Sequence, residues 1–60
     1  MFTVARKLNN GQEIPFFRAM DIDEINKAIR LAKLADAFPM VDEYRVYTED
    51  NFLFYRVTAR

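Results

Sequence analysis

Alternating hydrophobic and polar positions at both ends of the chain predict strands, and a helical pattern lies between them. Residues 1–9 and 12–19 are predicted strands that flank Asn10-Gly11. Asn-Gly favours a tight hairpin, because both residues tolerate the positive φ of a type I′ turn. A two-residue loop would set three cross-strand pairs: Asn9 with Gln12, Val4 with Phe17 and Phe2 with Ala19.

The middle of the chain predicts a helix over residues 21–37. Asp21 is a good N-cap, and Glu24 three residues later resembles the second member of a capping box. Pro39 ends the pattern, because the residue before a proline is pushed out of the helical region. The apolar residues cover about half of the helix surface, which is wider than one sheet face usually needs. They are Ile22, Ile25, Ala28, Ile29, Leu31, Ala32, Ala35 and Phe38.

Residues 43–48 and 52–58 predict a second hairpin around residues 49–51. Its register is open, but an even-numbered loop sorts the side chains cleanly between two faces. A three-residue loop would mix the two sets and is discounted. One face then holds Tyr44, Val46, Leu53, Tyr55 and Val57. The other holds Arg45, Tyr47, Phe52, Phe54 and Arg56.

These elements predict a single α+β domain over residues 1–60 with the order ββαββ. The two-residue loop places Pro15 opposite Arg6 at a non-hydrogen-bonded position, so the second strand is expected at a sheet edge. A right-handed crossover through the helix then puts the third strand beside the first. The prediction is a four-stranded antiparallel sheet in the order 2-1-3-4, with the helix packed on one face.

Composition excludes several kinds of catalytic site. The chain has no Cys, no His and no Ser, so Ser–His and Cys–His pairs cannot form within it. Only one Gly is present, which excludes a glycine-rich phosphate loop. Nine basic and nine acidic residues give no net charge. We therefore expect a non-enzymatic protein without a cofactor or a metal. The chain has no apolar segment long enough to predict a signal peptide or a membrane span. We therefore expect the protein to be located in the cytoplasm.

The predicted sheet face opposite the helix combines cations with aromatic rings. Four cations, Lys7 among them, accompany a single acid, Glu43. Such a face is large for a small monomer to leave bare. The candidate partner-binding residues on it are Phe16, Arg18, Arg45, Tyr47, Phe52, Phe54 and Arg56.

Three interpretations of this surface stay open. In the first, two copies bury their sheets or their wide helix faces in a homodimer, with Leu31, Leu34 and Phe38 as candidate helix contacts. In the second, the sheet face docks on a different protein, since Arg, Tyr and Phe are enriched in interfaces. In the third, the face binds single-stranded nucleic acid by stacking bases on its rings. The zero net charge speaks against the third interpretation.

Part of the chain resembles two known groups of small proteins. The pattern is Glu13-Ile14-Pro15-Phe16-Phe17 with Ala19, followed by Asp23-Glu24, Ala28 and Leu31-Ala32. It is similar to the hairpin and helix of small phage early proteins that inhibit host RNA polymerase, and to the partial RNase-H-like domain of HicB-type antitoxins. The resemblance implies a compact, non-catalytic protein that acts by occupying a partner, in the host cytoplasm if phage-encoded. The leading hypothesis is a protein-binding regulator or inhibitor; the alternative is a single-strand nucleic-acid-binding module.

Overall fold

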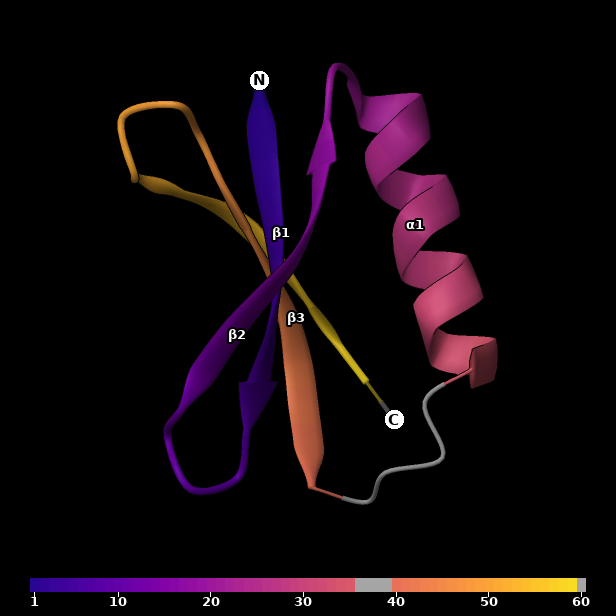
Figure 1. Cartoon of the computed structure of the whole chain (residues 1–60), viewed down its shortest axis with the longest axis vertical. Helices are drawn as coiled ribbons and strands as arrows, with labels where there is room; N and C mark the ends of the chain where they lie inside the picture. The colour runs from indigo at the N-terminus through magenta and orange to yellow at the C-terminus, as the bar shows by residue number, and fades with distance from the viewer. Residues whose placement is uncertain (36–39, 60) are drawn as a thin grey trace.

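A computed structural model describes residues 1–35 and 40–59 of the chain. Two hairpins form one sheet, and the helix between them in the sequence lies to one side of the strands (Figure 1). The elements are β1 (Phe2–Leu8), β2 (Glu13–Ala19), α1 (Ile22–Ala35), β3 (Val41–Tyr47) and β4 (Leu53–Thr58). The four strands form one antiparallel sheet in the order β2-β1-β3-β4, which confirms the predicted ββαββ fold and strand order. In the described part, no helix has the length and apolar character needed to span a membrane.

The first hairpin has a three-residue loop, so the predicted two-residue turn is wrong. The Leu8 N–H donates to the Gln12 carbonyl at 2.8 Å, which leaves Asn9, Asn10 and Gly11 in the loop. Among these only Gly11 has a positive φ, of 90°. A type I′ turn needs positive φ at both central residues, whereas a three-residue loop needs it only at the last.

A β-bulge at Phe16 compensates for the longer loop. Val4 pairs with Phe17 as predicted, but Ala5 pairs with Pro15, so Phe16 is an extra residue in β2. The expected pairing of Pro15 with Arg6 is therefore wrong by one position. Because the two irregularities cancel, β2 keeps its predicted alignment near Ala19 and loses it between Glu13 and Phe16. Its place at the sheet edge is confirmed.

The second hairpin repeats this arrangement. The Thr48 N–H donates to the Phe52 carbonyl at 2.8 Å, and Asn51 takes a positive φ of 66° at the end of a three-residue loop. Val46 pairs with Tyr55 and Tyr47 pairs with Leu53, which makes Phe54 the extra residue. The discounted loop length is thus the observed one, because the bulge restores the alternation that the loop disturbs.

Helix α1 begins where the sequence predicts. The Glu24 N–H donates to Oδ1 of Asp21 at 2.9 Å, which confirms Asp21 as the N-cap. The described helix ends at Ala35, so residues 36–37 of the predicted helix and its predicted stop at Pro39 lie outside the described residues.

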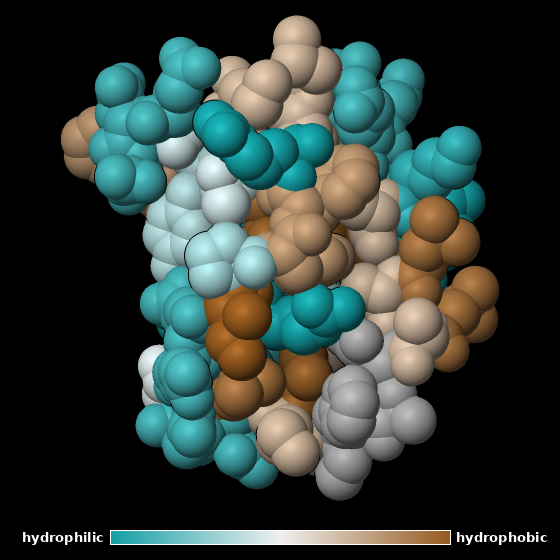
Figure 2. All heavy atoms as spheres, viewed as in Figure 1, coloured by the Kyte–Doolittle hydropathy of each residue, from teal (hydrophilic) through white to brown (hydrophobic). Residues whose placement is uncertain are grey.

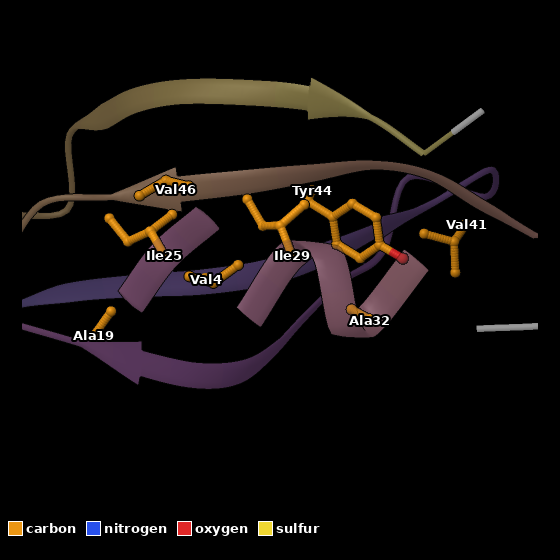
Figure 3. Packing of buried hydrophobic residues seen from close by; sticks show 8 residues of the cluster. All are labelled: Val4, Ala19, Ile25, Ile29, Ala32, Val41, Tyr44 and Val46. Carbon is orange, nitrogen blue, oxygen red and sulfur yellow. The ribbon is translucent and has the colours of Figure 1, made fainter. Parts of the chain in front are cut away.

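The core lies between α1 and the sheet. Ile25 and Ile29 of the helix face the side chains of β1 and β3 (Figure 3). Tyr44 contributes the largest fully buried side chain. The cluster comprises Val4, Ala19, Ile25, Ile29, Ala32, Val41, Tyr44 and Val46. The helix lies closest to β1 and β2. As a result, β4 at the opposite edge has the least cover.

Candidate functional site

The sheet face turned away from α1, here called the open face, has three rows of side chains. The strand register and the alternation of side chains define them. The first row is Arg18, Thr3, Tyr47 and Leu53. The second is Pro15, Ala5, Arg45 and Arg56. The third is Glu13, Lys7, Glu43 and Thr58. The face carries four cations and two acids, because the bulge in β2 brings Glu13 onto it.

A polar network crosses the open face from β2 to β3. The Arg45 guanidinium lies 3.1 Å from a carboxylate oxygen of Glu13 and 3.1 Å from one of Glu43. The Tyr47 hydroxyl donates to the other oxygen of Glu13. These side chains reach over β1, where the small side chain of Ala5 is buried. The network therefore closes the centre of the open face, where the sequence predicted a surface available to a partner.

The network also alters the acidity of Tyr47. Its hydrogen bond to the Glu13 carboxylate raises the pKa of the phenol above the ordinary value, and partial burial adds to the rise. The raised pKa keeps the hydroxyl protonated, and so a hydrogen-bond donor, further into the alkaline range. Tyr47 is thus held by its own chain and is poorly placed to stack on a ligand.

Two of the predicted partner-binding aromatics lie on the helix side of the sheet. Phe16 packs against the core cluster, edge-on to Tyr44 at a ring distance of 6.1 Å. Phe54 stacks on Phe2 at 5.2 Å, and Phe2 also packs against that cluster. The open-face assignment of Phe16 and Phe54 is therefore wrong, because each is the extra residue of a bulge. Leu53 was predicted on the face of Tyr44, but its pairing with Tyr47 places it on the open face.

Three consecutive exposed apolar residues lie on the second hairpin. Phe52 is 70% exposed, Leu53 46% and Phe54 47%. A run of three exposed apolar residues is unusual outside functional surfaces. With the two residues that complete the strand edge, they make up what we call the β4 edge surface: Phe52, Leu53, Phe54, Arg56 and Thr58.

Hydrogen-bond alternation along β4 identifies the backbone groups that point outward. The Ala59 N–H donates to the Asp42 carbonyl at 3.0 Å, so this pair is a bonded one. In an antiparallel ladder bonded and non-bonded pairs alternate. Thr58 opposite Glu43 and Arg56 opposite Arg45 are therefore non-bonded pairs. Both Arg56 and Thr58 direct their N–H and C=O groups to the outer edge of β4, where no described strand pairs with them.

The two sheet edges differ in how well they are protected. β2 contains Pro15 and a bulge and lies beside α1, all features that discourage further strand pairing. β4 contains neither Pro nor Lys, and Arg56 is its one charged residue. Arg56 forms no ion pair with any residue in the described ranges, whereas Arg45 opposite it is held by two carboxylates. The outer edge of β4 therefore combines exposed apolar side chains with backbone groups and a cation that no residue of the ranges 1–35 and 40–59 pairs with.

The helix presents a smaller apolar surface. Leu31 is 57% exposed and Leu34 is 83% exposed. Figure 2 shows apolar atoms on the outer side of the C-terminal half of α1. Phe38, the third predicted dimer contact, lies outside the described residues. Arg18 is exposed at the far corner of the open face, well separated in the strand order from β4.

Sequence reasoning missed Leu53 and Thr58 as parts of the exposed edge. The available signal was Asn51, because Asn is the residue other than Gly that most readily adopts the left-handed conformation. Its position as the third residue after Thr48 is typical of a three-residue loop. The sequence contains no comparable signal for the bulge at Phe54.

The described residues contain no cluster of acidic side chains suited to a metal ion, and none of their buried side-chain polar atoms lacks a hydrogen-bond partner. Comparison with known proteins gives no further guide, since no protein family, curated protein or solved structure shows a significant match to the chain.

Proposed function

We propose that this chain is a non-catalytic regulator or inhibitor that acts in the cytoplasm by occupying a partner protein through its β4 edge surface. The observation that carries the proposal is the exposed run Phe52-Leu53-Phe54, where the loop of the second hairpin leads into the edge strand β4. Burying such a run against a partner removes apolar area from water, at about 25 cal/mol per Å². Aromatic side chains are also the commonest anchors of protein interfaces. The absence of Cys agrees with a reducing compartment.

The single-strand nucleic-acid alternative has less support in this arrangement. It required several rings among the cations of the open face. Phe16 and Phe54 lie on the helix side, and Tyr47 is bonded to Glu13. Two acids, Glu13 and Glu43, also lie among the cations that would hold phosphates.

We also propose that two copies associate through α1. Leu31 and Leu34 are three residues apart, so they share one side of the helix. A small domain without a disulfide gains stability from burying such side chains. This contact leaves both β4 edges available to partners.

Affinity capture with matched variants tests the protein-binding proposal. The bait is the intact chain, and the sources are nuclease-treated and untreated lysates of the cells in which the chain occurs. Phe52→Ser should abolish retention of a protein that the wild type retains. Met20→Ser is the matched control, because Met20 is 66% exposed and directly follows β2, the second strand of the first hairpin. Retention of no protein, retention that depends on nucleic acid, or equal loss in both variants would contradict the proposal.

A further inference from the structure

We propose that β4 accepts an extended segment of the partner as a fifth strand, and that this segment alternates apolar with acidic residues. This inference rests on the proposed function and specifies how the partner is bound. Strand addition is a recurring mode of peptide recognition in which backbone hydrogen bonds supply affinity and alternate side chains supply specificity. Three properties of the β4 edge surface lead to it.

The first property is the direction of the backbone groups. Arg56 and Thr58 each present an outward N–H and C=O, and they are two positions apart, as the pairing of one added strand requires. The other edge offers no comparable site, because Pro15 lacks an N–H and Phe16 interrupts the ladder of β2.

The second property is the apolar surface on the helix side of β4. Tyr55 and Val57 are only half-buried there, and Phe54 is 47% exposed. The Tyr55 hydroxyl contacts Oδ1 of Asn26 at 3.3 Å, which fixes the ring between β4 and α1. An added strand would continue the sheet beside these side chains, so its own residues on the helix side should be apolar.

The third property is the charge on the open face of β4. Arg56 is the edge residue of its row and has no acidic partner in the part of the chain that the structure describes. Its neighbour in the row is Arg45, a like charge. An acidic side chain on an added strand would lie beside Arg56, and cross-strand pairs of opposite charge are stabilising. A second copy of β4 would bring no acid to this position, because the strand contains none.

The test uses a capped peptide of alternating valine and glutamate, about eight residues long and so within the usual length of a strand. Amide chemical shifts of the labelled chain should change along β4 as the peptide is added, with saturation. A peptide with lysine in place of each glutamate should bind about tenfold more weakly or worse. Arg56→Glu should reverse this preference, and Arg56→Lys should retain it.

Two further arms test the backbone contact itself. Thr58→Pro removes an outward N–H without removing a bond to β3, and should weaken binding about tenfold. Thr58→Val is the control, because it keeps the N–H and suits a strand. Methylation of alternate peptide nitrogens should weaken binding to the unaltered chain. This arm tests the same backbone hydrogen bonds even if Thr58→Pro disturbs the strand.

The outcomes separate the two proposals. Strand addition is overturned if shifts map outside β4, if no saturable binding occurs, or if binding ignores both Thr58→Pro and peptide methylation. It is likewise overturned if β4 pairs with a second copy of itself. Should partner capture depend on Phe52 but not on the Thr58 N–H, the protein-binding function would stand and the added strand would be wrong.

Discussion

Arg45 and Arg56 are direct cross-strand partners on the open face of the sheet, although both carry a positive charge. The charge of Arg45 is compensated by two carboxylates, those of Glu13 on β2 and Glu43 on β3. Arg56 is left at the outer edge without an acid from any described residue. Like charges directly opposite one another destabilise a sheet. This unfavourable pairing supports the proposal that Arg56 contacts a partner.

Replacing Arg56 should separate stability from binding. Arg56→Glu turns a repulsive pair with Arg45 into an attractive one, so we expect the free energy of unfolding to rise by about 0.2–1 kcal/mol. The same variant should lose its partner. Urea denaturation of wild type and variant measures the first effect and affinity capture the second. A variant that is less stable than the wild type would show that Arg56 has an internal role.

The face assignments can be checked with two identical substitutions. Phe16→Ala removes a ring that packs on Tyr44 and lies 4.1 Å beneath the guanidinium of Arg6. We expect it to lower the free energy of unfolding by roughly 2–4 kcal/mol. Phe52→Ala removes a ring that is 70% exposed and should change stability by less than about 0.5 kcal/mol. Both values come from denaturation at one protein concentration, because association adds to apparent stability. A larger loss of stability in Phe52→Ala than in Phe16→Ala would show that Phe16 lies on the open face.

The hydrogen bond between Tyr47 and Glu13 should appear in an alkaline titration. The pKa of Tyr47 is raised in the folded chain, so its contribution to stability is present below the unfolded pKa, about 10. That contribution is lost as pH rises through the folded pKa. Ultraviolet absorbance should show late tyrosinate formation from both Tyr47 and Tyr55, because burial also raises the pKa of Tyr55. Tyr47→Phe should remove only the Tyr47 transition and so lower the late amplitude. Glu13→Gln should shift the transition towards the ordinary tyrosine range. A Tyr47 that titrates normally in the wild type would contradict the observed network.

The proposed helix contact gives a prediction about oligomeric state. Sedimentation should show a dimer at micromolar concentration, and Leu34→Lys should convert it to a monomer without unfolding it, since Leu34 is 83% exposed. The matched control is Ile22→Lys, at the opposite end of α1, which should remain dimeric. A wild type that sediments as a 7.1 kDa monomer at hundreds of micromolar would refute the contact.

The sequence predicted the order of elements but not the side-chain faces near the loops. Strand order followed from Pro15 and the handedness of the crossover, which act over whole elements. The helix start followed from one capping residue, Asp21. Both loop lengths were wrong, because Asn10 and Gly11 fit a two-residue turn as well as a three-residue one. The bulges at Phe16 and Phe54 depend on packing against Tyr44 and Phe2, a tertiary effect that local pattern does not encode.

The bulges also explain why several side chains of the candidate site lie on a different face from the one the sequence predicted. A one-residue change of register moves a side chain to the other face. It carried Phe16 and Phe54 to the helix side and brought Glu13 and Leu53 to the open face. Arg45 and Tyr47 kept their predicted face because the bulges at Phe16 and Phe54 lie in β2 and β4, not in β3, and Arg56 kept its face because it follows the bulge at Phe54. The sequence thus located the cations of the surface and misplaced two of its rings, Phe16 and Phe54.

The amide of Arg56 offers the most direct test of the β4 edge as the binding surface. Hydrogen exchange of this amide should be measured in the free chain and in the chain saturated with the alternating valine–glutamate peptide. In the free chain it should exchange much faster than the amide of Val57, which bonds to β3. With peptide bound, exchange at Arg56 should slow by about tenfold or more, while α1 is unaffected. Exchange at Arg56 that is already as slow as at Val57, or that does not change at saturation, would contradict the account.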